Sequence, residues 1–327
     1  MIFPAMWRDV KAPSIDLVTC IRAFYLLSAS AILLTRAIPP LRDRFLDYGA
    51  RQTRRDGGNT SIAAGSSDRK LSSTTSAFLD SLAQVKVSHA RFSDFYSLSL
   101  LCLVFWSYQI FVGGAALQLL HEFVPETKHS SSQARVSLCL LLFATQSLRR
   151  LDECFSLTKS LKSSSSMWVG HYAIGLAFYF FTNIAIFVEH GPFVRDSRGF
   201  GSLVSEESLS ISALDLLALT AFVVASLKQH KYHRYLYSLR KYTLPDEHSF
   251  RLVVAPHYTA ECLIYVSLSL LSAPYGHNIN RTMFCALIFV FVNLGVTADG
   301  TKRWMLSKFP DRQDDIRSRW RMIPMVF

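Results

Sequence analysis

The sequence lacks the short motifs that identify many soluble nucleotide-binding and hydrolytic enzymes. Its 327 residues contain no GxGxxG after a strand, no GxxxxGKS/T, no HExxH and no GxSxG. The six cysteines are scattered, no two of them form CxxC, and no histidine cluster argues for a metal. We therefore expect single buried thiols, no disulfide framework and no metal site. These absences exclude few membrane enzymes, whose cofactor sites need not be Rossmann-like.

Signals for processing and for nucleic-acid binding are also missing. No cleavable signal peptide is evident, because the first apolar block is long enough to remain as an anchor. The C-terminus has no lipid-anchor motif. The net charge is +11, yet the basic residues flank apolar segments and form no stripe with interleaved aromatics. We expect no nucleic-acid partner.

Long apolar segments are abundant. Hydrophobic residues make up 50% of the chain and the mean hydropathy is +0.22. They gather in blocks near the ~20 residues that a helix needs to cross a bilayer. We predict an all-α, polytopic membrane protein with about seven transmembrane helices. The predicted spans are residues 14–35, 96–120, 135–148, 168–188, 209–227, 259–274 and 282–298.

The placement of Lys and Arg indicates the orientation of these spans. The predicted inner segments 37–95, 149–166, 228–257 and 302–327 contain 9, 4, 6 and 7 of them. The predicted outer loops near 121–135, 189–208 and 275–281 contain 2, 2 and 1. An excess of Lys and Arg on the cytoplasmic side is the usual pattern of membrane proteins. It predicts the N-terminus outside and the C-terminus inside.

One inner segment differs in composition from the rest of the chain. Residues from about 49 to 76 are rich in Arg, Ser, Gly and Asp and poor in large apolar side chains. Such a stretch cannot bury enough surface to order itself, so we predict a flexible inner loop. Residues 78–97, which follow, are expected to form an amphipathic helix lying along the membrane.

Polar residues gather where the predicted spans end on the inner side. Gln229, His233 and Arg240 are four and seven residues apart, and so would share one face of a helix. His257 and Glu261 are also four apart. Two such faces opposite each other could bind a phosphorylated dinucleotide. Arg and Lys would contact the phosphates, while Gln, His and Glu would bond the ribose or the carboxamide.

Each of these residues also has a plainer interpretation. Lys and Arg at inner span ends commonly anchor a helix by reaching the lipid headgroups. His233 alone is typical of an interfacial residue, and Glu261 could pair with a neighbouring arginine. The run RRLDE at 149–153 could be a charge cluster that compensates itself. Spacing alone leaves these alternatives open.

Several segments in combination resemble the steroid 5α-reductase family, and within it the polyprenol reductase branch. They are RRLDE (149–153), QHKYHRYLYSLRK (229–241), PHYTAECLIY (256–265), KRW and KFP after the last span, and SRWRMIPMVF (318–327). The resemblance covers residues 146–327. Residues 1–145 match only in having early spans.

The resemblance implies a multi-pass enzyme of the endoplasmic reticulum membrane that uses NADPH. The N-terminus would then be luminal and the C-terminus cytosolic. Such enzymes reduce the double bond next to an oxygenated carbon, and in this branch the product leads to dolichol, the lipid carrier of protein N-glycosylation. The substrate would be a long-chain polyisoprenoid lipid. Residues 146–327 would form the catalytic part, and residues 1–145 an N-terminal transmembrane part.

The resemblance also assigns roles by position. The cofactor contacts would be Gln229, His233, Arg240, Lys241, His257, Glu261 and Arg319. Arg149 or Arg150, with Glu153, would lie near the substrate. Relatives that reduce steroids carry Asn, Asp and Asn where this chain has Gln229, His233 and His257, which argues against a steroid. Thr301 and Met305 replace a His and a Tyr found in many members, and Lys302 or Trp304 would have to substitute for those contacts.

The chemistry favours an aldehyde as the true acceptor. Hydride addition to carbon needs an electron sink, which an α,β-unsaturated carbonyl supplies and an allylic alcohol does not. We therefore predict polyprenal as the substrate, with Arg150 or Tyr258 meeting the developing oxyanion. Alternatives are a steroid 5α-reductase, a very-long-chain enoyl-CoA reductase and, in another class, a non-enzymatic seven-span receptor or transporter.

Overall fold

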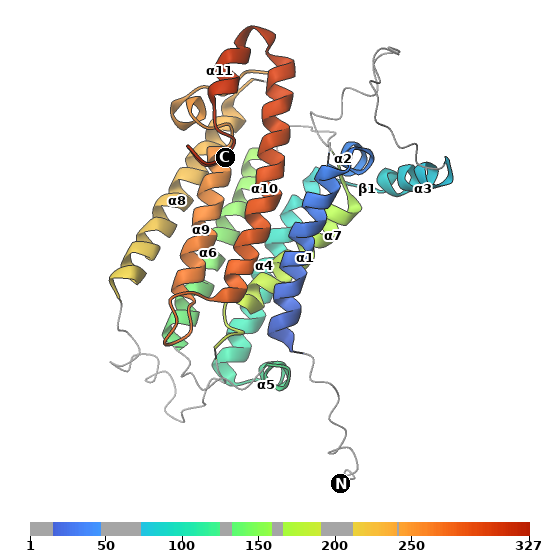
Figure 1. Ribbon diagram of the computed structural model, residues 1–327. Coiled ribbons are helices and arrows are strands. Elements are labelled where there is room, and N and C mark those ends of the chain that lie inside the picture. Colours follow the sequence, from blue (N-terminus) through green and yellow to red (C-terminus); the bar gives the residue numbers. More distant parts are fainter. Residues whose placement is uncertain (1–15, 47–72, 125–132, 159–165, 191–211, 241) are drawn as a thin grey trace.

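In the part of the chain that the computed structural model describes, seven long helices run side by side (Figure 1). The structure describes residues 16–46, 73–124, 133–158, 166–190, 212–240 and 242–327. The long helices are α1 (Leu17–Ala37), α4 (Phe92–Val112), α6 (Gln133–Thr158), α7 (Val169–Ala185), α8 (Ala213–Ser238), α9 (Pro256–Leu271) and α10 (Arg281–Lys308). Successive long helices alternate in direction, so one end of the bundle collects the C-terminal ends of α1, α6, α8 and α10. We call this the upper end, as drawn.

Short elements close the two ends of the bundle. They are α2 (Pro39–Phe45), α3 (Ser73–Gln84), β1 (Lys86–Ser88), η2 (His89–Arg91), α5 (Ala115–Glu122), β2 (Ser166–Trp168), η5 (His248–Arg251), η6 (Pro310–Arg312) and α11 (Gln313–Ser318). The two strands pair antiparallel, with Val87 opposite Met167. The described chain is therefore mostly helical, as the sequence predicts.

Each predicted span overlaps one long helix. Four helical segments are long and apolar enough to cross a membrane by length and composition: Leu17–Ala37, His89–Val112, Ala213–Ser238 and Arg281–Lys308. The other three predicted spans correspond to α6, α7 and α9. Their helical structure is confirmed, while their crossing of a membrane and the orientation of the termini stay predictions.

Local sequence fixes the lower ends of three upward-running helices. Asp16 accepts a hydrogen bond from the Val18 amide at 2.9 Å and caps α1. Ser212 and Asp215 form a reciprocal capping box at the start of α8. Asn280 accepts from the Met283 amide at 2.9 Å and caps α10. Each cap satisfies a backbone donor that the first helical turn leaves unpaired.

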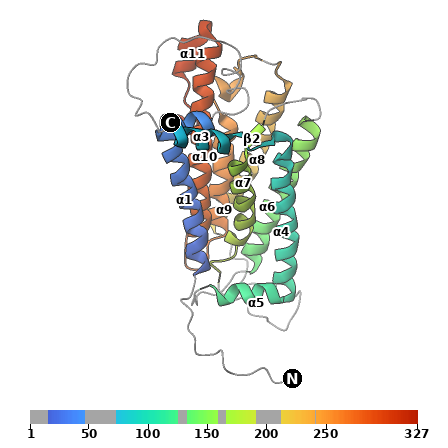
Figure 2. The same ribbon diagram turned by 90° about the vertical axis from the view of Figure 1, so that its right-hand side faces the viewer.

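The second predicted span is shorter than expected. Residues 96–120 do not form one helix, because α4 ends at Val112 and the chain turns at Gly113. Gly113 has φ 62°, a left-handed conformation that glycine adopts without steric cost. The chain then enters α5, which lies across the lower end of the bundle (Figure 2).

The predicted amphipathic helix over 78–97 is also wrong as a single element. Helix α3 ends at Gln84, residues 86–88 form β1, and the chain from Phe92 onward already belongs to α4. Part of the predicted flexible loop is helical, because α3 begins at Ser73. Residues 49–72 of that loop lie outside the described residues. Pairing of β1 with β2 competes with helix here, and neither strand is recognisable from three residues alone.

The thiols partly follow the expectation. All six cysteines are free. Cys102, Cys139 and Cys262 are buried, but Cys20 is exposed on α1. In a helix bundle that meets lipid, an exposed thiol costs little, because it behaves as a small apolar group.

Candidate active site

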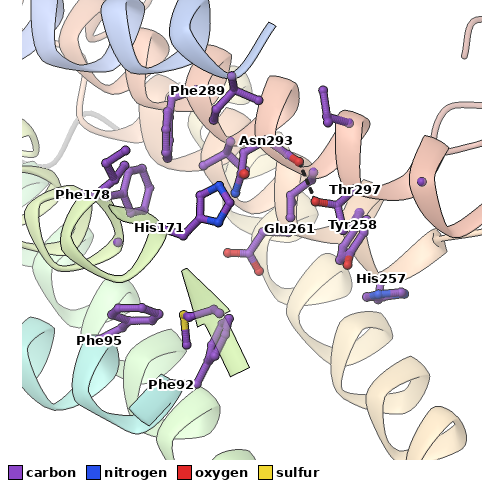
Figure 3. Close-up of a pocket in the computed structure, with 18 of the residues that line it drawn as sticks. Phe92, Phe95, His171, Phe178, His257, Tyr258, Glu261, Phe289, Asn293 and Thr297 are labelled. Atoms are coloured by element: carbon purple, nitrogen blue, oxygen red, sulfur yellow. Dashed lines mark hydrogen bonds between the residues drawn. The ribbon is translucent and has the colours of Figure 1, made fainter. Parts of the chain in front are cut away.

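A cavity of about 540 Å³ opens within the upper half of the bundle. One wall is polar and the other aromatic. The polar wall contains Arg150 from α6, Gln229 and His233 from α8, and His257, Tyr258 and Glu261 from α9. The aromatic wall contains Phe92, Phe95 and Tyr96 from α4, Phe178 and Tyr179 from α7, Tyr265 from α9 and Phe289 from α10. Figure 3 shows Glu261 reaching from α9 toward the space between these walls.

Glu261 is held by an amide and not by an arginine. The Gln229 side-chain NH₂ donates to Glu261 Oε2. Gln229 Oε1 in turn accepts from Arg149 Nη2 and from Gln146 Nε2, the latter at 3.0 Å. Among the described residues Glu261 has no ion pair, so the alternative of simple pairing with an arginine is not found. A charge-assisted bond fixes the carboxylate while leaving its negative charge at the cavity wall.

Glu153 is the centre of a buried charge cluster next to this wall. Its side chain is 3% exposed and accepts from Arg149 and Arg150 on its own helix. His230 Nδ1 and His233 Nδ1 on α8 each lie 2.7 Å from its oxygens. Glu153 does not line the cavity, so the structure makes it a residue that positions Arg150 and His233. The interpretation of RRLDE as a charge cluster that compensates itself is thus correct in part. His230 and His233 of α8 also belong to the cluster.

Removing the Glu153 charge is expected to destabilise the protein. A Glu153→Gln substitution keeps the size but leaves two partly buried guanidiniums without their shared carboxylate, a loss of roughly 3–5 kcal/mol for a buried pair. The melting temperature of the purified protein in detergent measures the effect. Asp152→Asn is the matched control, because Asp152 is the exposed neighbour of Glu153 on the same helix. Equal melting of the two variants would contradict the prediction.

Tyr96 belongs to the site although the sequence gives no motif for it. Arg150 Nε donates to the Tyr96 hydroxyl oxygen at 3.0 Å, and the guanidinium carbon lies 5.2 Å from the centre of the tyrosine ring. With its oxygen accepting from Arg150, the phenol has its own proton to donate to another group. A tyrosine at the first residue of the predicted span 96–120 is the only sequence signal that could have indicated it.

His257 carries a buried polar atom without a partner. Its Nδ1 has no hydrogen bond among the described residues. The ring packs against Tyr258 at 4.2 Å and against His233 at 5.5 Å between centroids. Buried polar atoms are nearly always paired in folded proteins. A donor or acceptor in the wall of a cavity without such a partner is therefore an observation that fits a polar ligand.

Two predicted cofactor residues, Arg240 and Arg319, do not line the cavity. Helix α8 ends at Ser238, so Arg240 does not share a face with Gln229 and His233, and it is exposed. Lys241 lies outside the described residues. Arg319 is buried, donates to the Pro245 carbonyl and pairs with Asp315 at 2.7 Å, which lowers the pKa of the Asp315 carboxyl. Arg319 therefore ties the chain end to the segment after α8.

The expected substitutes near Thr301 and Met305 are not found in the wall either. The Thr301 hydroxyl donates to the Thr297 carbonyl at 2.9 Å, and Met305 is buried in a small separate core. The Lys302 amine donates to the carbonyls of Arg317 and Arg319. Helix α10 instead contributes Asn293, Thr297 and Arg303 to the cavity, and α1 and α2 contribute Arg36 and Arg42, none of which the sequence indicated.

Comparisons with known proteins agree with the C-terminal resemblance. Residues 176–327 match the family described as 3-oxo-5-alpha-steroid 4-dehydrogenase. A polyprenal reductase of Saccharomyces cerevisiae is 31% identical over 169 residues, 50% of this chain and 56% of that protein, so the match spans about half of the relative. A polyprenal reductase of Xenopus tropicalis is 27% identical over 63% of this chain and 70% of the length of that relative. A polyprenal reductase of Ailuropoda melanoleuca is 25% identical over 88% of this chain and 91% of the length of that relative.

The three relatives named above share one description. All three are described as polyprenal reductases. The family match covers residues 176–327, less than half of the chain, and the yeast relative is matched over 56% of its length, so the comparisons establish a similarity to reductases of this family.

Proposed function

We propose that the protein reduces the α-isoprene double bond of polyprenal, using NADPH, in the endoplasmic reticulum membrane on the route to dolichol. The observation that supports this most is the meeting of a polar and an aromatic wall in one cavity at Arg150 and Tyr96. The polar wall suits a dinucleotide, and the aromatic wall suits an unsaturated lipid head. Relatives described as polyprenal reductases support the choice of substrate.

The residues present fit NADPH. Gln229, His257 and Glu261 offer an amide, an unpartnered imidazole nitrogen and a fixed carboxylate in one wall. These groups match the hydrogen-bonding capacity of a carboxamide and ribose hydroxyls. When bound, NADPH supplies a hydride.

The side chains of this protein would stabilise the charge that reduction creates. Hydride arriving at the β-carbon of an enal would move negative charge to the aldehyde oxygen, which needs a placed donor, and a proton from water would then reach the α-carbon to complete the reduction. Arg150 fixes the Tyr96 oxygen, and we propose that the Tyr96 hydroxyl donates to the aldehyde. Tyr258 lines the same cavity and is the second candidate. An allylic alcohol has no such oxygen charge to stabilise, which is why polyprenal is the expected substrate.

The outer faces of the helices suit a lipid environment. Large apolar side chains are exposed on α1, α4, α6 and α8. Between 65% and 71% of the surface is exposed in each of Leu27, Leu101, Val104, Leu141 and Leu217. Exposed large apolar side chains along four helices suit contact with lipid better than contact with water. We propose that all seven long helices span the membrane, with the cavity toward the cytosol, so that the polyisoprenoid tail stays in lipid while its head enters.

A substrate panel tests the proposal. Purified protein with NADPH is expected to reduce polyprenal, and to leave polyprenol, a 3-oxo-4-ene steroid and a very-long-chain enoyl-CoA unreduced. Mass spectrometry of the products is the measurement, because each reduction adds two hydrogens. Reduction of polyprenol without an aldehyde intermediate would contradict the proposed substrate, and turnover of the steroid or the thioester would move the chain to another branch of the family.

A further inference from the structure

Three aromatic rings close the lowest part of the cavity. Tyr265 of α9 and Phe289 of α10 are the lowest cavity residues on their helices, and Phe178 of α7 packs against both. The ring centroid of Phe178 lies 5.2 Å from that of Phe289 and 5.7 Å from that of Tyr265. We call these three rings the aromatic floor. Because the rings are in contact, the three helices hold these positions at one level of the bundle.

Asn293 lies one helical turn above the aromatic floor. Helix α10 runs upward, so Asn293, four residues after Phe289, is about 6 Å higher on the same face. Helix α9 runs downward, so Glu261, four residues before Tyr265, is higher by the same rise. Both residues line the cavity, and Figure 3 shows the Asn293 side chain directed toward the space that Glu261 faces. Asn293 and Glu261 therefore face one layer of the cavity.

The side-chain amide of Asn293 has no protein partner in the part of the chain that the structure describes. Only its backbone carbonyl has a side-chain contact, accepting from the Thr297 hydroxyl at 2.9 Å, the bond drawn in Figure 3. Polar groups inside a folded protein are nearly always hydrogen-bonded. An amide that faces a cavity without such a bond can both donate to and accept from a ligand.

The surroundings of this amide are apolar. Asn293 follows ten apolar residues, 283–292, on a helix long and apolar enough to cross a membrane. Its neighbours in the cavity wall are Val290, Leu294 and Val296. A polar side chain in such a helix costs free energy and commonly marks a substrate site. A dinucleotide would find few polar partners on this wall, whereas a flat apolar head with one oxygen fits it.

We propose that the Asn293 amide donates a hydrogen bond to the aldehyde oxygen of polyprenal, as a second donor beside Tyr96, and so determines specificity for an enal. This inference rests on the proposed function. A donor fixed in advance lowers the barrier because it meets the charge that hydride transfer moves onto this oxygen, and asparagine amides can serve in this role. Asn293 acts by hydrogen bonding alone and exchanges no proton with the substrate.

Asn293→Leu tests the proposal, because it removes the amide and keeps a similar size. The kcat of the purified full chain for polyprenal is expected to fall by about tenfold to a hundredfold, with Tyr96 remaining as a donor. The dissociation constant of NADPH is expected to stay within about twofold. Since the hydride step becomes slower, NADPH with two deuterium atoms at C4 of the nicotinamide is expected to show a kinetic isotope effect on kcat at least as large as in the wild type.

Stability is expected to change in the opposite sense to activity. Leucine leaves no group of the protein unsatisfied at this position, so the variant is expected to melt at or above the wild-type temperature. Asn183→Leu is the matched control. Asn183 is a buried asparagine of α7 outside the cavity, and its Nδ2 donates to the Tyr179 carbonyl at 2.7 Å. This control is expected to melt lower and to keep kcat within about threefold.

The outcomes separate this inference from the proposed function. If the wild type does not reduce polyprenal, both fail. If the wild type reduces polyprenal and Asn293→Leu keeps its kcat, this inference alone is overturned. Weaker NADPH binding by Asn293→Leu would make the amide a cofactor contact. A joint fall in kcat and melting temperature, with a smaller isotope effect, would make it a structural residue. Either result overturns the inference and leaves the reductase proposal standing.

Discussion

Replacing Tyr96 by phenylalanine is expected to lower kcat for polyprenal by about 10²- to 10³-fold, the usual cost of removing one donor to a developing oxyanion. The substitution removes only the hydroxyl, whose oxygen accepts from Arg150 Nε at 3.0 Å. NADPH binding is expected to be unchanged, because the loss concerns the transition state of reduction. Steady-state kinetics together with the dissociation constant of NADPH measure both quantities.

Tyr25→Phe is the control for this experiment. Tyr25 is also a buried tyrosine, with its hydroxyl 3.1 Å from the Thr182 hydroxyl, and it does not line the cavity. Loss of one internal hydrogen bond there is expected to affect stability by about 1 kcal/mol and kcat little. If Tyr96→Phe keeps wild-type kcat while Tyr258→Phe loses it, the oxyanion donor is Tyr258, and Tyr96 only holds Arg150.

The sequence predicts the helices well because hydrophobic length and helical period are local properties. Each block near the thickness of a bilayer contains a helix, and residues four apart fall on one face. Gln229 and His233 therefore reach the cavity together, as do His257 and Glu261. The break after α4 could have been expected from the adjacent Gly113 and Gly114, which were included in a continuous span.

Contacts between distant segments explain the rest. Arg150 donates a hydrogen bond to Tyr96, which is 54 residues away in the sequence. Arg36 donates to Asp299, which is 263 residues away. No periodicity encodes such pairs, so an arginine at a span end has the same sequence signature whether it anchors a helix or lines a cavity. Arg240 lies off the predicted helix face for a related reason. The helix ends at Ser238 and Leu239 adopts extended backbone, with no proline or glycine in the sequence to indicate this end.

Glu261→Gln is expected to weaken NADPH binding by about tenfold or more, since bonds to a charged acceptor contribute ~1.5–3 kcal/mol. The side chain keeps its shape, but the carboxylate that Gln229 orients becomes a neutral amide. One of its two polar atoms is then a donor instead of an acceptor. The oxygen of the new amide can still accept from Gln229, so Gln229 keeps Arg149 and Gln146 as partners and the main change is the loss of negative charge at the cavity wall. Fluorescence titration with NADPH, and protection by NADPH against heat, measure the loss.

The control for this substitution is Glu189→Gln, at the opposite end of the bundle. Glu189 is likewise a partly buried carboxylate, pairing with Arg22 at 2.7 Å, and it does not line the cavity. Both variants are expected to melt below the wild type, because each weakens a charge-assisted bond, but Glu189→Gln is expected to keep wild-type NADPH affinity. The proposed cofactor site depends on the negative charge of Glu261, which Gln229 holds in place. If Glu261→Gln keeps wild-type NADPH affinity, the cofactor binds elsewhere. The carboxylate is then only a structural partner of Gln229.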